Sequence, residues 1–165
     1  MNLEIERRFL LKNDKWKKFI AKKCFIEQGY LSDNFDDWIT RIRFNGKNYK
    51  IALKKHLRNF TNFEFEYIIP DSDGKQIMSS LTNTIKKERF FLEVEKKTWI
   101  IDCFKEKNFP LEVAEVELSK EEEKLSLPNF ISKEITGLKN FSNFSLSTYP
   151  VSKWGVKDLT KIKKS

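Results

Sequence analysis

The sequence predicts an α+β protein in which eight antiparallel strands close into a barrel, with helices packed outside. Short segments alternate strictly between polar and apolar residues, as half-buried strands do. Asn45-Gly46 separates two of these segments and is a strong hairpin signal. Charged residues make up 34% of the chain, so some of them need a place other than an ordinary solvated surface.

The alternation defines the predicted strands. It covers residues 3–9, 39–44, 49–54, 63–69, 87–94, 98–104 and 112–118. In the second segment, for example, Ile42 and Phe44 alternate with Arg41 and Arg43. Such a strand has one apolar face that must be covered and one charged face.

Helices are expected between the strands. Residues 14–23 carry Trp16 and other apolar residues at helical spacing, and a second helix over 71–83 begins after Pro70. Ser119 followed by Glu122 matches a capping box that opens a short helix. The last part of the chain is expected to hold one short strand and a helix near residues 140–147.

Size and composition limit the organisation of the chain. Its 165 residues suit one domain, which we place at residues 1–155, followed by a basic tail at 156–165. Cys24 and Cys103 lack metal-binding spacing and read as reduced thiols, and no signal peptide or apolar membrane span is evident. We therefore expect a cytoplasmic protein with no membrane partner.

The formal net charge of +8 suggests an anionic partner. Nucleic acid, membrane headgroups and phosphorylated metabolites all carry such charge. The aromatic residues lie mostly at core spacing and do not interleave with basic residues, so nucleic acid is the weaker candidate.

The charged strand faces permit two arrangements. In the first, an ordinary sheet packs its apolar face on helices and exposes its charges to water, which is the commoner case on periodicity alone. In the second, the sheet closes into a barrel with the charges inside, which removes the sheet edges and leaves room for a small ligand.

The chemistry of the charged faces favours the barrel. Buried charges must be paired or must bind compensating ions. Arginine and lysine suit phosphate oxygens, and clustered carboxylates suit Mg²⁺ or Mn²⁺. The two sets are the cations Arg8, Arg41, Arg43, Lys50, Lys54, Lys87 and Arg89, and the acids Glu4, Glu6, Glu64, Glu66, Asp102, Glu115 and Glu117.

These residues resemble the CYTH family, the triphosphate tunnel metalloenzymes. The N-terminal Glu4-Ile5-Glu6-Arg7-Arg8 matches the family's ExExK signature, with arginine at the final position. The resemblance continues in the family's order and covers nearly the whole chain, closest to the short bacterial members. It runs through the segments QGYL at 28–31, RIR at 41–43, a Lys54 strand, EFEY at 64–67, KERF at 87–90, DCF at 102–104, AEVEL at 114–118, EIT at 134–136 and FSN at 141–143.

The resemblance implies a ligand set. Glu4, Glu6 and Glu117 would hold a divalent metal, Mg²⁺ or Mn²⁺, and Asp102 and Glu115 would support it or bind a second ion. The positions that would bind phosphate are Arg8, Arg41, Arg43, Lys54, Lys87 and Arg89.

One position departs from the family's pattern. Asn62 stands where the family usually has an arginine, so Arg58 is a candidate replacement from the preceding loop. The lone His56 lies in a basic stretch and reads as a surface residue.

The function that the resemblance implies is hydrolysis of the terminal phosphate of inorganic triphosphate. Lys87 is the candidate acid on the leaving-group side, with Tyr30 as its partner. A carboxylate would position the water, with Glu64, Glu66, Asp102 and Glu115 as the candidates. Alternatively, Lys87 only clamps phosphate and Tyr30 only packs. A class IV adenylate cyclase and a non-catalytic polyphosphate or nucleotide binder are the other functions considered. Either a monomer or a homodimer is compatible with the sequence.

Overall fold

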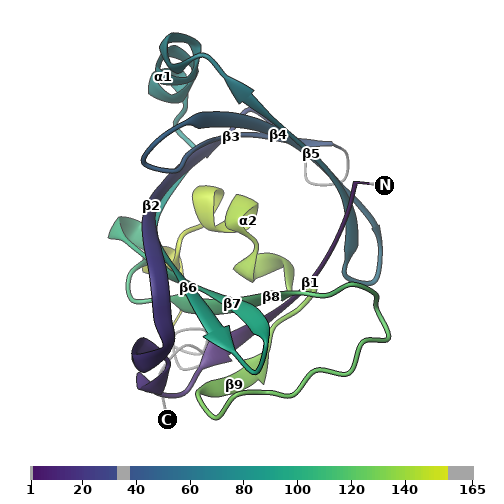
Figure 1. Cartoon of the computed structure of the whole chain (residues 1–165). Coiled ribbons are helices and arrows are strands. Elements are labelled where there is room, and N and C mark those ends of the chain that lie inside the picture. Colours follow the sequence, from purple (N-terminus) through teal and green to yellow (C-terminus); the bar gives the residue numbers. More distant parts are fainter. Residues whose placement is uncertain (1, 33–37, 156–165) are drawn as a thin grey trace.

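The computed structural model of the chain describes residues 2–32 and 38–155, and an antiparallel barrel dominates it (Figure 1). The strands are β1 (Leu3–Leu11), β2 (Ile20–Tyr30), β3 (Ile39–Phe44), β4 (Tyr49–Arg58), β5 (Thr61–Ile69), β6 (Thr84–Val94), β7 (Lys97–Phe104), β8 (Glu112–Glu117) and β9 (Ile131–Glu134). The α-helices are α1 (Asp71–Ser80) and α2 (Asn143–Thr148), and the 3₁₀ turns are η1 (Lys15–Phe19), η2 (Glu106–Asn108), η3 (Lys139–Phe141) and η4 (Val151–Lys153).

Eight of the strands close into a ring in the order β5-β4-β3-β2-β6-β7-β8-β1. The ring is completed where residues 3–5 of β1 pair with residues 61–63 of β5. Strand β9 pairs with the far end of β1 and lies outside the ring (Figure 1). Closure leaves the eight strands without a free edge, and the predicted eight-stranded antiparallel barrel is confirmed.

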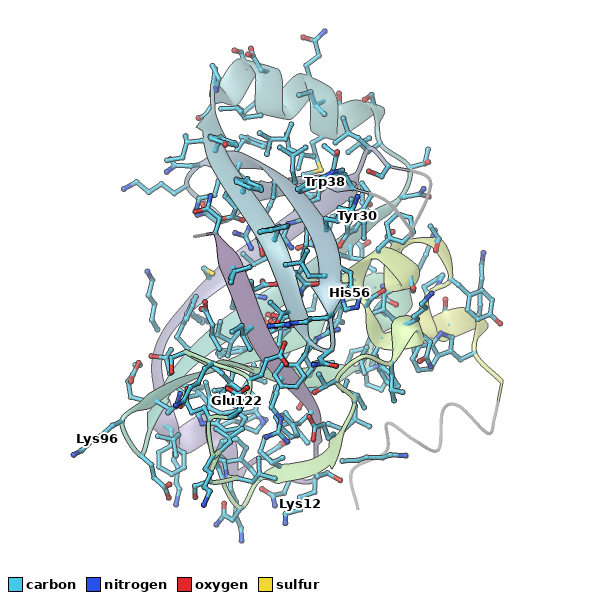
Figure 2. The ribbon with its side chains drawn as sticks, turned by 90° about the vertical axis from the view of Figure 1, so that its right-hand side faces the viewer. Lys12, Tyr30, Trp38, His56, Lys96 and Glu122 are labelled. Carbon is cyan, nitrogen blue, oxygen red and sulfur yellow. The ribbon has the colours of Figure 1, made fainter. Side chains whose placement is uncertain are left out.

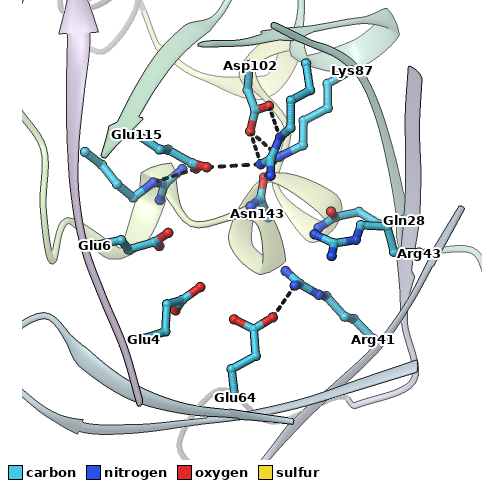
Figure 3. Close-up of polar contacts among 12 residues, drawn as sticks. Glu4, Glu6, Gln28, Arg41, Arg43, Glu64, Lys87, Asp102, Glu115 and Asn143 are labelled. Atoms are coloured by element: carbon cyan, nitrogen blue, oxygen red, sulfur yellow. Dashed lines mark hydrogen bonds and ion pairs between the residues drawn. The ribbon is translucent and has the colours of Figure 1, made fainter. Parts of the chain in front are cut away.

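The register of the strands puts the charged residues on a single face of the sheet. Arg8 lies opposite Glu115, and Arg89 lies opposite Asp102. Cross-strand partners share one face of a sheet, and this face lines the interior of the barrel (Figure 3). The sheet therefore closes into a barrel with its charges inside, and does not form an open sheet with its charges exposed to water.

The outer, apolar faces are covered in two places. Trp16 from η1 and Phe130 pack with Leu92 and Trp99 in one buried cluster. Against the opposite wall, α1 packs Met78 on the outer face of the β3–β4 hairpin. At Gly74 of α1 an added Cβ would lie 2.2 Å from the Tyr49 ring, so glycine allows the close approach of this helix.

The C-terminal segment closes one end of the barrel. Inward-facing Leu10, Ile85 and Phe104 form a buried apolar cluster with Phe141 and Leu146. Helix α2 lies within the outline of the ring in Figure 1 and at one end of it in Figure 2. Helix α1 thus packs outside, as expected, whereas α2 fills the barrel end because the strand residues there are apolar on their inner face.

Two of the predicted helices are wrong. Residues 14–23 form the short turn η1 and then the start of β2, because Trp16 is buried by one turn and the chain then pairs with β6. No helix follows Ser119, whose backbone N–H and hydroxyl both bind the Glu123 carboxylate at 2.8 Å. The Asn45-Gly46 hairpin, the helix after Pro70, the short strand near the C-terminus and the helix that follows it are confirmed.

The predicted tail at 156–165 lies outside the described residues, and the domain boundary at residue 155 stays a prediction. None of the helices in the described ranges is both long and apolar enough to cross a membrane.

Candidate active site

The interior of the barrel brings together the charged residues that the strand alternation singled out (Figure 3). Buried charges require partners, and every predicted tunnel cation forms an ion pair with an interior carboxylate. These cations are Arg8, Arg41, Arg43, Lys50, Lys54, Lys87 and Arg89.

Asp102 on β7 is the centre of a buried network. Its carboxylate accepts a hydrogen bond from Lys87 Nζ at 2.5 Å and two from the Arg89 guanidinium, both at 2.7 Å. The side chains of Asp102 and Lys87 are fully buried. Burial alone would raise the pKa of Asp102, but the charges of Arg89 and Lys87 outweigh it and lower this pKa below its ordinary value. Asp102 is therefore held as a carboxylate.

Glu115 on β8 extends this network to β1. Its two carboxylate oxygens accept hydrogen bonds from Arg89 Nη2 at 3.0 Å and from Arg8 Nε at 3.1 Å. The network thus links four neighbouring strands and positions two guanidinium groups, those of Arg8 and Arg89, at the tunnel wall.

Lys87 on β6 has a second acceptor besides Asp102. Its ammonium donates to Asn143 Oδ1 at 3.1 Å, so α2 reaches the network from the closed end of the barrel (Figure 3). Burial lowers the pKa of Lys87 to about 8, because the favourable effect of Asp102 does not make up for lost hydration and the nearby Arg89 charge. Lys87 therefore loses its proton at a lower pH than an ordinary lysine does.

Lys54 on β4 lies among three carboxylates on the opposite wall. Its Nζ forms an ion pair with Glu4 and lies 3.7 Å from Glu6 Oε1 and 3.8 Å from Glu64 Oε2. Burial would lower the pKa of Lys54, but the three acids Glu6, Glu4 and Glu64 outweigh it and raise this pKa. Burial raises the pKa of Glu4, and Lys54 offsets only part of that effect.

Strand β5 supplies the partners of the remaining cations. Arg41 Nη2 donates to Glu64 at 2.5 Å, and Lys50 Nζ donates to Glu66 at 3.1 Å. Arg43 also donates to Glu66. Burial would raise the pKa of Glu66, but Arg43 and Arg41 outweigh it and lower this pKa. Glu64 and Glu66 thus bind tunnel cations, and their role in positioning water stays a prediction.

The carboxylates predicted to hold a metal fall into two groups. Asp102 and Glu115 are engaged by the cations described above. Glu6 lies opposite Glu117 in the strand register, and burial together with the charges of Glu4 and Glu6 raises the pKa of Glu117. Three neighbouring carboxylates are the oxygen donors that Mg²⁺ and Mn²⁺ prefer, so the chemistry of this donor set fits a hard divalent cation.

The three carboxylates do not converge in their present positions. Among residues 2–32 and 38–155, no group of three Asp, Glu, His or Cys side chains is close enough to hold a metal ion. The ion pairs place the Lys54 ammonium beside Glu4 and Glu6.

Tyr30 is buried in the tunnel wall, and its hydroxyl contacts Gln28 instead of Lys87. Gln28 Nε2 donates to the Tyr30 hydroxyl at 2.6 Å, and the Tyr30 ring packs edge-on against Phe144. Burial raises the pKa of Tyr30 to about 12. In the described part of the chain, the hydrogen bonds of Tyr30 and Lys87 do not join the two side chains.

Arg58 is not brought into the tunnel. Its side chain is 80% exposed, and its Nε lies 3.9 Å from Glu121 at the barrel rim. The ladder between β4 and β5 shifts register between His56 and Arg58, which ends the inward alternation before residue 58. Asn62 does point inward, where its amide donates to Glu4 Oε2 at 3.3 Å and lies 3.4 Å from the exposed His56 ring.

Gln28 and Asn143 are site residues for which no role was predicted. Both are uncharged, and Asn143 reaches the network only because the C-terminal segment folds back over the barrel end. Their sequence signals were the QGYL and FSN segments of the family resemblance, together with Ser142, whose hydroxyl accepts from the Ser145 N–H and begins α2 at Asn143.

A cavity of about 260 Å³ adjoins the charged residues at the α2 end of the barrel. Arg8, Arg41 and Lys54 line it together with Phe60 and Phe144. Tyr30 and His56, which also line it, lie beside the C-terminal helices in Figure 2. A ligand could therefore contact the tunnel cations from this cavity.

Among curated proteins, the chain is similar to an inorganic triphosphatase of Acetivibrio thermocellus. The two are 32% identical over 152 residues, which is 91% of this chain and 96% of the relative. A search for family models gave no match.

Solved structures share the fold. The inorganic triphosphatase NE1496 matches with a TM-score of 0.64 and 24% identity, over 87% of this chain and 93% of its own. HpAC1 from Hippeastrum, a candidate adenylyl cyclase described as having a dominant triphosphatase activity, matches with a TM-score of 0.53 and 15% identity, over 73% and 80%. With its closed barrel, its charged interior and a relative of this identity over nearly its whole length, the chain belongs to the CYTH family of triphosphate tunnel proteins.

Proposed function

We propose that the chain hydrolyses the terminal phosphate of inorganic triphosphate. The observation that supports this most is a set of buried donors without acceptors among the described residues: Arg8 Nη2, Arg41 Nε and Arg43 Nε. Unsatisfied buried donors are costly. Three of them on tunnel guanidinium groups suit an anion with several oxygens in fixed positions, such as a triphosphate.

The tunnel residues would divide the work. Arg8, Arg41, Arg43, Lys54 and Arg89 would bind phosphate oxygens, and Glu4, Glu6 and Glu117 would hold Mg²⁺ or Mn²⁺. Such an ion would supply charge neutralisation on the phosphate oxygens. Glu64 or Glu66 would orient a water in line with the bond to be broken and accept its proton.

Lys87 is the candidate acid. As water attacks the terminal phosphorus, the bond to the bridging oxygen breaks, and Lys87 would give a proton to the diphosphate that leaves. Its pKa of about 8 suits this role. Alternatively, Lys87 only binds phosphate through its positive charge and transfers no proton.

Two variants separate the acid from the clamp. If Lys87 is the acid, Lys87→Arg should keep the affinity for tripolyphosphate but lower the rate at saturation sharply, and Tyr30→Phe should shift the pH–rate profile if Tyr30 assists it. A Lys87→Arg protein that turns over as fast as the parent would leave only the clamp.

A second candidate function is cyclisation of ATP. The cavity beside the tunnel has aromatic and apolar walls, including Ile39, Phe60 and Phe144, against which a base could stack. Cyclic AMP and diphosphate as products of ATP would support this function, whereas release of inorganic phosphate would not.

One assay tests the proposal. Phosphate release is measured from tripolyphosphate, ATP, thiamine triphosphate and pyrophosphate, each with Mg²⁺ or Mn²⁺. We expect tripolyphosphate to be hydrolysed fastest. Tight binding of tripolyphosphate without release of phosphate would instead indicate a non-catalytic binder. We also propose that the enzyme is cytoplasmic and acts as a monomer or a homodimer.

A further inference from the structure

Lys54 places its ammonium among three carboxylates of the tunnel. Its ammonium pairs with Glu4 and lies 3.7 Å from Glu6 and 3.8 Å from Glu64. Lys54 and Glu64 are direct neighbours across β4 and β5, and Glu4 lies on β1 where it pairs with β5. The lysine therefore extends across β5 and reaches the signature carboxylates from the opposite side of the barrel seam.

The charge around this ammonium is strongly unbalanced. In the described chain, the ion pairs of Glu4 and Glu6 both go to Lys54, and Glu117 adds a third carboxylate beside Glu6. Arg41 compensates Glu64. Among the described residues, Lys54 is thus the cation in ion-pair contact with Glu4 and Glu6, whereas the charges of Arg8, Arg89 and Arg41 act on these two acids without such a contact.

We propose that Lys54 is an exchangeable counterion, which competes with a divalent cation for the Glu4 and Glu6 carboxylates and moves to the triphosphate when that cation binds. The proposal rests on the metal-dependent triphosphatase function proposed above. It adds a role for Lys54 in the absence of substrate, besides that of a phosphate contact.

Displacing the Lys54 ammonium from its carboxylates has a cost in free energy. The Lys54 side chain is only 22% exposed, so losing both carboxylates to a cation would leave a largely buried charge without its partners, which is unfavourable. A triphosphate that arrives with the cation gives the ammonium new oxygens. Cation binding alone is therefore weakened by Lys54, and cation and triphosphate bind cooperatively, each improving the affinity of the other.

This leads to an unusual expectation for a residue that binds substrate. Lys54→Met removes the competing charge and keeps the side-chain bulk, so the phosphate-free protein should bind Mn²⁺ more tightly than the parent. Coupling between sites is typically worth 5- to 150-fold, and we expect a gain on the order of 10-fold. The same variant should bind tripolyphosphate more weakly.

Lys50→Met is the matched control. Lys50 is also a tunnel lysine on β4, but it donates to Glu66 at 3.1 Å and its ion pair does not involve Glu4 or Glu6. Removing its charge changes the net charge equally, so any tightening that it causes measures the general field of the barrel. We expect that tightening to be less than about 3-fold, because separated, partly exposed charges are screened.

The experiment is calorimetric titration of Mn²⁺ into parent, Lys54→Met and Lys50→Met proteins in phosphate-free buffer, with circular dichroism to check folding. Lys54→Gln, which keeps a donor, carries the test if the Met variant does not fold. A Lys54 variant that binds Mn²⁺ no more tightly than Lys50→Met overturns the proposal. No phosphate compound is present, so this result is independent of the phosphate-release assay, and failure of the triphosphatase function would show only there.

Discussion

Two groups of charged residues line the tunnel and adjoin on β8, which carries Glu115 and Glu117, and each combines carboxylates with cations to a different effect. The Asp102 group, formed by Asp102, Lys87, Arg89 and Glu115, has short hydrogen bonds of 2.5 to 3.0 Å and a fully buried centre. The Glu4 group, formed by Glu4, Glu6, Glu117 and Lys54, is partly exposed: Lys54 forms a close ion pair with Glu4, lies 3.7 Å from Glu6 Oε1 and has no ion pair with Glu117 among the described residues.

The difference lies in how completely each carboxylate is satisfied. Both oxygens of Asp102 accept from cationic donors, so the pKa of Asp102 is lowered despite its burial. Glu117 has acidic neighbours, and its pKa is raised by burial and by Glu4 and Glu6. A satisfied group gains little from a ligand, whereas an undercompensated one gains much. We therefore expect the Asp102 carboxylate to keep its partners and to hold Lys87 and Arg89 in place for a ligand, and the Glu4 group to exchange partners.

The largest expected effect follows from breaking the Glu4 group. Glu4→Ala or Glu6→Ala should lower phosphate release by about 1000-fold or more, corresponding to about 4 kcal/mol of transition-state stabilisation. Thermal unfolding should stay close to that of the parent. Chelation by EDTA should have the same effect on the parent, and added Mg²⁺ or Mn²⁺ should reverse it. Full activity in EDTA would contradict the metal assignment.

The next effect concerns stability and distinguishes the two groups directly. Asp102→Ala leaves Lys87 and Arg89 buried without their main acceptor, which should cost about 3–5 kcal/mol in the free energy of unfolding. Glu117→Ala removes one of several neighbouring negative charges and should leave that free energy unchanged or slightly higher. Urea unfolding of both variants measures the contrast, and equal losses would contradict the division into two groups.

The same comparison has a pH dependence. The pKa of Asp102 is lower in the folded chain than in the unfolded chain, so its contribution to stability is present above its ordinary pKa of 3.8. This contribution is lost as the pH falls from there through the lowered, folded-state pKa. Urea unfolding between pH 5 and pH 2 should therefore show a shallower acid decline for Asp102→Asn than for the parent.

A smaller effect is expected for the cations that would exchange their partners. Arg41 donates to Glu64 and keeps a buried Nε without an acceptor among the described residues. Removing one charge-assisted contact typically costs about 1.5–3 kcal/mol, so Arg41→Ala should lower kcat/KM for tripolyphosphate by roughly 10- to 150-fold. Arg41→Lys keeps the charge but loses the forked set of guanidinium donors, so its kcat/KM should lie between those of Arg41→Ala and the parent.

The smallest effect is expected at Arg58. The guanidinium is 80% exposed at the rim, and exposed charges contribute little. Arg58→Ala should change kcat/KM by less than about twofold, in contrast to Arg41→Ala. A loss as large as that of Arg41→Ala would show that Arg58 does replace the arginine missing at Asn62.

The sequence by itself determined the barrel, its charged face and seven of its eight strands. Alternation with period two is a local property, and a strict pattern such as Arg41-Ile42-Arg43-Phe44 leaves only one way for the strand to face the core. The chemistry of buried charges then favoured the closed barrel over an open sheet, and the family resemblance around Glu4 and Glu6 agreed with it. Strand β2 was not predicted: the helical spacing of the apolar residues over 14–23 covers its start, and pairing with β6 overrides that local signal.

Only the tertiary structure decided which charged residues pair with which. All fourteen interior charges have the same sequence signature, but the strand register and the depth in the barrel make Asp102 a saturated buried anchor and leave Glu117 undercompensated. Asn143 joins Lys87 only because the C-terminal segment folds over the barrel end, and Arg58 leaves the tunnel because of one register shift. These outcomes depend on contacts between residues far apart in the chain, and such contacts have no local pattern from which they could be predicted.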